Sequence, residues 1–255
     1  MTHLKPLGRK SYGSIGHLPN SRLGPSDRSI TAGQARICTT RSRDRHDTVI
    51  VQEKLDGSCV AVAMLDGVLH SLSRAGWAAA SSRYEQHRLF DQWVHENRER
   101  FLSVLRDGER IVGEWMAQAH GTRYDFAEGV EPFAAFDIMI GESRLPFEQF
   151  AVRIEGKFDQ PTLLHVGSPM TVDRAMQLHA VRNRRCDEPE GVVYRVERNG
   201  AVDFLAKWVR PDKIDGKYLP EVSGAAAVWN WRPSQSSPGK TSQGLGPVSM
   251  NLGSR

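Results

Sequence analysis

The chain has 255 residues, of which 39% are hydrophobic and 25% charged, and its formal net charge is +4. This composition is ordinary for a soluble globular protein. No stretch approaches the roughly 18 consecutive apolar residues needed to span a bilayer, and the first residues lack the apolar run of a secretory signal, so we expect a cytoplasmic protein. The cysteines at 38, 59 and 186 are too widely spaced to predict a disulfide framework or a zinc site.

The basic residues are unusually biased, with 26 arginines against eight lysines. The planar guanidinium group suits phosphate, so this bias favours a polyanionic partner. The codon usage of a GC-rich genome would produce the same bias equally well. Composition alone therefore leaves the partner open.

The first 48 residues predict an irregular N-terminal arm, because they are rich in Gly, Pro, Ser and Arg and hold few apolar residues. The pattern changes at residue 49, where apolar runs begin that are typical of strands, at 49–51, 59–65 and 68–72. Asp66-Gly67 separates the last two runs and is a strong signal for a two-residue hairpin turn.

Residues 84–106 predict one amphipathic helix, because their apolar positions recur at spacings of three and four outside one polar gap. Further strands are expected at 110–115 and 132–140. A second helix is expected to begin after Thr171, which suits an N-cap, and to end near residue 182.

Asn199-Gly200 predicts a second hairpin between the apolar runs 192–196 and 201–205. Strands dominate and helices interrupt them, which predicts an α+β domain of antiparallel sheets with flanking helices rather than a doubly wound parallel sheet. After residue 220 the composition shifts to Ser, Gly, Pro and Gln, which predicts a flexible tail over 221–255. The main domain would then span 49–220.

The run Glu53-Lys54-Leu55-Asp56-Gly57 contains the pattern Lys-x-Asp-Gly, which places a lysine at the end of a strand-like run and a glycine three residues on. The chain holds a second copy, Lys213-Ile-Asp-Gly216. We favour Lys54 as the functional lysine, because it ends a strand-like run and the other candidate motifs lie downstream of it. The prolines around Lys213 predict a surface turn.

Five further motifs follow in order: Ser73-Arg-Ala-Gly76, Val112-Gly-Glu-Trp115, Phe133-Ala-Ala-Phe-Asp-Ile138, Glu190-Gly-Val-Val-Tyr-Arg195 and Leu205-Ala-Lys-Trp208. With the Lys54 motif, this ordered set resembles the nucleotidyltransferase motifs of ATP-dependent RNA and DNA ligases and capping enzymes, and most closely the RNA ligase 2-like branch. The resemblance covers roughly 49–220. It implies a nucleotidyltransferase (ATP-grasp-like) domain without an OB-fold, since about 35 residues beyond 220 are too few for a five-stranded barrel.

The resemblance also implies a role for each matching position. Lys54 would be the catalytic nucleophile that attacks ATP and carries AMP. The other implied site residues are Glu53 for the nucleotide, Arg74 for the ribose or the incoming phosphate, Glu114 for the ribose, Phe136 or Phe133 for the adenine, Lys207 for the α-phosphate, Glu190 for Mg²⁺, and Arg195 and Arg210 for phosphate or nucleic acid.

Two positions depart from the family's pattern. Its last motif usually holds a Lys-x-Lys pair, whereas this chain has the single Lys207 with Arg210 three residues on. The family also often has Asn where Cys59 stands. These departures leave open which group makes the second phosphate contact and whether one polar contact near the nucleotide is kept.

A protonated lysine cannot act as a nucleophile, so we expect the site to lower the pKa of Lys54 from the ordinary value of about 10.4. Burial and nearby positive charge would do this. Arg74, Lys207 and a bound Mg²⁺ would supply that charge.

The resemblance implies an ATP-dependent RNA ligase that joins 3′-hydroxyl and 5′-phosphate ends through a lysyl-AMP and an adenylylated nucleic acid. Its partners would be ATP, Mg²⁺ and nucleic acid, either RNA or a nicked duplex. The alternatives are a minimal ATP-dependent DNA ligase, a GTP-dependent capping guanylyltransferase and a non-catalytic nucleic-acid-binding module. The sequence does not fix the oligomeric state.

Overall fold

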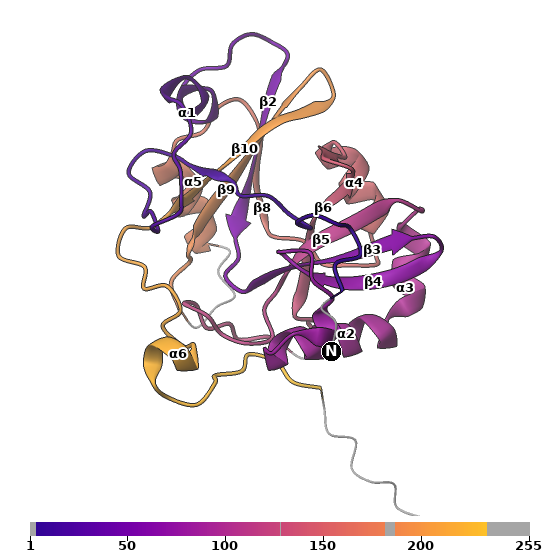
Figure 1. Cartoon of the computed structure of the whole chain (residues 1–255). Coiled ribbons are helices and arrows are strands. Elements are labelled where there is room, and N and C mark those ends of the chain that lie inside the picture. The colour runs from indigo at the N-terminus through magenta and orange to yellow at the C-terminus, as the bar shows by residue number, and fades with distance from the viewer. Residues whose placement is uncertain (1–3, 128, 182–186, 234–255) are drawn as a thin grey trace, which may run out of the picture.

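Two five-stranded sheets form the framework of the protein in the computed structural model, which describes residues 4–127, 129–181 and 187–233 (Figure 1). All the neighbouring strands in both sheets run antiparallel except one pair, in which β1 runs parallel to β10. The predicted α+β class with antiparallel sheets and flanking helices is therefore confirmed.

The first sheet carries two helices on one face. Its strands, in spatial order, are β1 (Gly16–His17), β10 (Ala201–Val209), β9 (Gly191–Arg198), β2 (Asp47–Lys54) and β8 (Leu163–Gly167). Helices α1 (Ala32–Thr39) and α5 (Val172–Val181) cover it (Figure 1). Cys38 and Ala175 from these helices share a buried cluster with Val49 and Val51 of β2.

The second sheet is packed against an aromatic core. Its strands, in order, are β4 (Val68–Ser73), β3 (Ser58–Leu65), β5 (Glu109–Trp115), β6 (Phe133–Ile140) and β7 (Ser143–Arg144). The helical elements that follow or flank it are η1 (Ala79–Ser81), α2 (Glu85–Glu96), α3 (Arg98–Val104) and α4 (Phe147–Ile154). Phe90, Trp93 and Phe101 from α2 and α3 pack on Trp115 and Phe133 of the sheet.

Both predicted hairpins are confirmed. β3 and β4 pair up to Leu65 and Val68, and β9 and β10 pair up to Arg198 and Ala201. In each turn both central residues have positive φ, 50° and 74° in both cases. Asp-Gly and Asn-Gly accept this geometry readily, which is why these two turns are readable from sequence.

The predicted helix over 84–106 is interrupted. Asn97 has φ −106° and ψ 20°, and it separates α2 from α3. Its side-chain amide donates to the carbonyl of Trp93 at 2.9 Å, so it closes the first helix with a side-chain contact. An asparagine side chain can replace a hydrogen bond of the helix backbone with one of its own. It can therefore end a helix even where the apolar pattern continues.

The segment predicted as an irregular arm, residues 1–48, contains regular elements that its composition did not reveal. Residues 32–39 form α1, with a capping box at Thr31, and β1 joins the edge of the first sheet. Tyr12 is buried, and the Ser11 carbonyl accepts a 2.7 Å hydrogen bond from the buried Arg110 side chain. The segment has few apolar residues, yet Leu18, Ala35 and Cys38 are buried in the core of the first sheet.

The first residues of the predicted tail, 221–233, contact the domain. Helix α6 (Pro220–Ser223) is followed by a segment that returns to the domain, where Trp231 packs edge-on against Trp115 at 5.8 Å. The Asn230 side chain donates to the Met116 carbonyl at 2.8 Å. Residues 234–255, Cys186 and the predicted end of the second helix at residue 182 lie outside the described residues. Among those that are described, no helix has the length and apolar character to cross a bilayer.

Candidate active site

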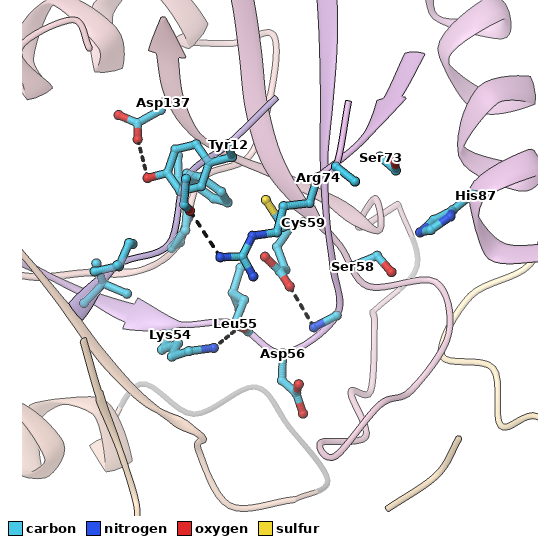
Figure 2. A pocket seen from close by; sticks show the side chains of 18 of the residues that line it. Tyr12, Lys54, Leu55, Asp56, Ser58, Cys59, Ser73, Arg74, His87 and Asp137 are labelled. Atoms are coloured by element: carbon cyan, nitrogen blue, oxygen red, sulfur yellow. Dashed lines mark hydrogen bonds between the residues drawn. The ribbon is translucent and has the colours of Figure 1, made fainter. Parts of the chain in front are cut away.

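A pocket of about 860 Å³ lies between the two sheets (Figure 2). It is lined by β2, β9 and β10 of the first sheet, by β3 to β6 of the second, and by Tyr12, Gly13 and Ile15 of the N-terminal segment. Of the predicted site residues, it brings together Glu53, Lys54, Arg74, Glu114, Phe136, Arg195 and Lys207.

The register of β2 decides which way the Lys54 side chain points. Ile50 packs with the core of the second sheet, whereas Val49 and Val51 pack with the helices of the first. Successive side chains on a strand point to opposite faces, so Lys54 shares the face of Ile50. Glu53 points the other way, where its carboxylate accepts hydrogen bonds from the Thr162 backbone at 2.9 Å and hydroxyl at 3.0 Å. Its carboxylate therefore has a structural contact, although the residue also borders the pocket.

Four charged side chains form a continuous chain of ion pairs at the end of β2. The Lys54 Nζ lies 2.6 Å from Glu190 Oε2, and the Lys213 Nζ lies 2.6 Å from Glu190 Oε1. Lys213 also contacts Asp56 Oδ2 at 2.9 Å. Because positive and negative groups alternate in these ion pairs, Glu190 and Asp56 are held in place beside Lys54.

Lys213 is a site residue that the sequence analysis placed wrongly. The prolines around it predicted a surface turn, but its relative exposure is only 4%. Its segment lies against the loop after β5, where the Tyr218 backbone donates to the His120 carbonyl at 2.7 Å. The one available signal was the second Lys-x-Asp-Gly motif, and it carried no information about burial.

Glu114, on β5, lines the pocket and interacts with Lys54 and both acids of the ion-pair network. Its Oε1 accepts a 2.9 Å hydrogen bond from the Gly57 backbone, and burial raises its pKa to about 7, with Glu190 and Asp56 adding to the rise and Lys54 opposing it. A Cβ at Gly57 would stand 2.5 Å from the Trp115 carbonyl oxygen, so only glycine fits between this strand end and β5. The motif glycine therefore brings Lys54 and Glu114 to the same cavity.

The charge around Lys54 is opposite to the predicted one. Burial lowers its pKa, but the carboxylates of Glu190, Glu114 and Asp56 outweigh burial and raise the pKa above its ordinary value. The expectation of a lowered pKa is thus wrong for the protein without ligands. The lysine rests as a cation, and its activation requires a change in the local charge.

A β-bulge aims Phe136 into the pocket. Gly113 of β5 pairs with Ala135 and Val112 pairs with Asp137, so the pairing skips Phe136. A bulge of this kind turns consecutive residues toward one side of a sheet. Phe136 contacts Tyr12 in the pocket at a ring separation of 5.2 Å, while Phe133 is buried in the aromatic core. Of the two predicted adenine contacts, only Phe136 is available.

Arg74 and Lys207 are held by the N-terminal segment. The Arg74 guanidinium extends into the pocket and donates to the Gly13 carbonyl and the Ser14 hydroxyl, both at 3.2 Å (Figure 2). Lys207 lies 3.5 Å from Asp27, and burial together with the charge of Lys54 lowers its pKa. Asp27 was not predicted, since no motif marks it.

Arg195 and Arg210, predicted as phosphate or nucleic-acid contacts, are both engaged by acids of the protein. The buried guanidinium of Arg195 binds the Asp137 carboxylate and donates to the Phe136 carbonyl at 3.1 Å, so it joins β9 to β6. Arg210 lies outside the pocket and pairs with Asp212 at 2.6 Å and Glu188 at 3.1 Å.

The donor set fits a weakly held magnesium ion. Within the described ranges, no group of three or more His, Cys, Asp or Glu side chains could hold a metal alone. Mg²⁺ usually keeps several waters and binds through one or two carboxylates together with substrate phosphates. Glu190 and Glu114, which both act on Lys54, supply such carboxylates.

The chain is similar to RNA ligases of known structure. Among solved structures, an archaeal ATP-dependent RNA ligase is 19% identical, with a TM-score of 0.44 over 64% of this chain and 42% of its own. A Naegleria gruberi RNA ligase mutant with AMP and Mn is 15% identical, with a TM-score of 0.47 over 79% of this chain and 60% of its own. This chain thus matches about half of each of these proteins.

No curated protein matches the chain. The model of the RNA ligase family matches residues 47–209, which run from the start of β2 to the end of β10 and hold Lys54, Glu114, Glu190 and Lys207. The chain belongs to the RNA ligase family.

Proposed function

We propose that this protein is an ATP-dependent RNA ligase that seals a 3′-hydroxyl to a 5′-phosphate through a lysyl-AMP intermediate. The observation that carries the proposal is the meeting of Lys54, Arg74, Glu114, Phe136 and Lys207 in one pocket between the sheets. A lysine nucleophile, an aromatic platform and two cations are the groups that transfer of a nucleotide to an amine requires.

In the first step, Lys54 Nζ attacks the α-phosphorus of ATP, and the bond to pyrophosphate breaks. Lys54 must first lose a proton, and Glu190 Oε2, at 2.6 Å, is placed to accept it. Mg²⁺ bound at Glu190 or Glu114 would offset the carboxylate charge that keeps Lys54 protonated and would stabilise the leaving pyrophosphate. Phe136 would contact the adenine, Glu114 the ribose and Lys207 the α-phosphate.

In the second step, the 5′-phosphate of a nucleic-acid strand attacks the lysyl-AMP phosphorus, so AMP passes to the strand and Lys54 is released. The 3′-hydroxyl of the neighbouring strand then attacks the activated 5′-phosphate and expels AMP. Arg74 lies on the pocket wall where it can hold the incoming phosphate. Mg²⁺ as the physiological metal, RNA repair as the process and the cytoplasm as the compartment are part of the same proposal.

The direct test is mass analysis of the intact protein after incubation with ATP and Mg²⁺. We expect an AMP adduct on the wild type and on Lys157→Ala, which changes an exposed lysine, and none on Lys54→Ala. Adduct formation with GTP but not ATP would favour a capping guanylyltransferase. The absence of an adduct with either nucleotide on a folded wild-type protein would favour a binding module and contradict the proposal.

A sealing assay separates RNA ligase from DNA ligase activity. Nicked duplexes with RNA or DNA on the 3′-hydroxyl side are compared at equal enzyme concentration. We expect sealing to depend on RNA at that position. Equal or better sealing of an all-DNA nick would support the minimal DNA ligase instead.

A further inference from the structure

The pocket continues beyond the nucleotide site to a rim formed by the loop after β4 and the start of α2. Trp77, Arg83, Tyr84 and His87 line this end of the pocket. His87 lies past Ser58, on the side opposite Tyr12 (Figure 2). The roles assigned above to the nucleotide site do not use these rim residues.

Two large aromatic side chains are exposed on this rim. Trp77 is 43% exposed and Tyr84 is 38% exposed. Across the described part of the chain, every other Phe, Tyr and Trp is buried or partly buried. Single exposed apolar residues are common on proteins, but both of the exposed aromatic residues border the same functional pocket. Their position points to a ligand that the pocket admits.

Each aromatic side chain is accompanied by a cation. The Lys5 Nζ lies 5.2 Å from the Trp77 ring centroid, and the Arg83 guanidinium carbon lies 4.7 Å from that of Tyr84. The neighbouring acid Glu85 is paired with Arg232 at 3.0 Å, so its charge is offset. The rim therefore combines flat aromatic faces with excess positive charge.

We propose that this rim, made of Lys5, Trp77, Arg83 and Tyr84, binds unpaired nucleotides of the RNA strand whose end enters the pocket. Bases of a single strand stack on aromatic side chains, while basic groups beside them contact the phosphates. Bases within a duplex are already stacked on one another, so the aromatic faces favour a single-stranded segment. The identity of the strand as RNA rests on the proposed function.

The test measures strand binding without ATP, by fluorescence anisotropy with a labelled, short, 5′-phosphorylated single-stranded RNA. We expect Trp77→Ala and Tyr84→Ala each to weaken binding about tenfold. Trp77→Phe and Tyr84→Phe keep an aromatic face and should bind nearly as the wild type does. Val152→Ala, at an exposed apolar position on α4, is the control and should have no effect.

Two further measurements sharpen the result. Adduct formation with ATP alone should persist in both alanine variants, because the change lies at the rim, whereas transfer of AMP to the strand should fall with strand affinity. Lys5→Ala combined with Arg83→Ala should make binding less dependent on salt, since two phosphate contacts are lost.

Wild-type strand affinity in the double variant Trp77→Ala/Tyr84→Ala would overturn the proposal. An equal loss of strand affinity in the phenylalanine variants would also overturn it, because stacking would then not be the cause. So would an equal loss of affinity for a fully paired duplex in the alanine variants. If the wild type forms no adduct but strand binding still depends on Trp77 and Tyr84, the proposed ligase function is contradicted. The proposal that the rim binds a strand is then still supported.

Discussion

Lys213 does more at this site than its place outside the main motifs indicates. It holds Glu190 and Asp56 at 2.6 and 2.9 Å, so the acid that contacts Lys54 is oriented from its other oxygen. Among these ion-paired residues, Lys54 lines the pocket, whereas Lys213 does not. Lys213 is therefore a positioning residue that acts through Glu190.

We expect Lys213→Met to slow formation of the Lys54 adduct at least about tenfold, the loss that corresponds to roughly 1.4 kcal/mol in the barrier. Without Lys213, both contacts that fix Glu190 and Asp56 on that side are lost. Rapid-quench measurement of adduct formation checks this, with Lys213→Arg expected to recover part of the rate. Lys217→Met, at an exposed neighbouring lysine, is the matched control.

Removal of one partner from a buried ion pair costs about 3–5 kcal/mol, so folding of Lys213→Met must be verified first by near-UV circular dichroism. A folded variant that forms the adduct at the wild-type rate would show that Lys213 serves stability alone.

Titration of Glu114 makes the folding stability of the ligand-free protein depend on pH. Its pKa is raised to about 7, so between its ordinary pKa and 7 the folded state holds a proton that the unfolded chain has released. The contribution of Glu114 to stability is present at low pH, falls as pH rises through this range and levels off above about 7. Its size is about 3 kcal/mol, since the pKa rises from its ordinary 4.5 to about 7 and each pKa unit corresponds to about 1.4 kcal/mol.

Urea unfolding of the wild type and of Glu114→Gln at pH 5 and pH 7.5 checks this prediction. The glutamine keeps a carbonyl oxygen that can accept from the Gly57 backbone but cannot titrate. The wild type should lose more stability than the variant between the two pH values. An identical change in both proteins would show that Glu114 does not titrate in this range.

At the residue scale, the motif order was enough to find the pocket side chains to which the proposed chemistry assigns a role. They are Lys54, Arg74, Glu114, Phe136 and Lys207, which all line the pocket. Each stands in a motif that resembles one of the nucleotidyltransferase motifs, and that resemblance is what made them predictable. Lys213 and Asp27 were not predicted as site residues. Their roles come from long-range contacts, of Lys213 with Glu190 and of Asp27 with Lys207. The direction of the Lys54 pKa shift depends on where three carboxylates converge, which spacing along the chain does not encode.

At the element scale, features determined by neighbouring residues could be predicted, whereas features determined by pairing with distant strands could not. The two hairpin turns were predicted because two residues determine each of them. β1 has two residues and β8 five, and each forms through pairing with a distant strand. The bulge at Phe136 likewise depends on its register with β5 and leaves no mark in the sequence of β6.

The N-terminal segment offers a test of its structural role. Tyr12 is buried, packs against Phe136 and donates its hydroxyl to Asp137 at 2.7 Å. Tyr12→Ala should destabilise the protein by about 3–5 kcal/mol, as large aromatic truncations do, and should weaken ATP binding by opening the pocket wall. Tyr12→Phe loses one hydrogen bond and should cost about 1 kcal/mol.

Urea unfolding and ATP binding by calorimetry measure both effects. His46→Ala, at an exposed position in the same segment, is a control that should change neither quantity. If Tyr12→Ala unfolded at the wild-type urea concentration, the segment would behave as the loose arm that composition alone predicts.

At the scale of the whole molecule, a buried charge network joins the two sheets beside the pocket. Asp137 of β6, which is fully buried, binds Arg195 of β9, Arg144 of β7 at 3.1 Å and Tyr12. The Arg195 guanidinium also donates to the Leu145 carbonyl at 3.2 Å. Groups from both sheets and from the N-terminal segment thus depend on one carboxylate, which links the pocket's shape to the stability of the fold.

We expect Asp137→Ala and Arg195→Met each to destabilise the protein by about 3–5 kcal/mol, because each removes one partner of a buried ion pair. The double variant should lose clearly less than the sum of the two, since the second change removes the group that the first had stranded. Urea unfolding of the four proteins completes this cycle. Arg9→Met, which breaks an exposed pair with Glu142, should cost far less. Additive losses in the cycle would mean that the two side chains act separately, and the sheets would then be held together by the apolar clusters that flank the pocket.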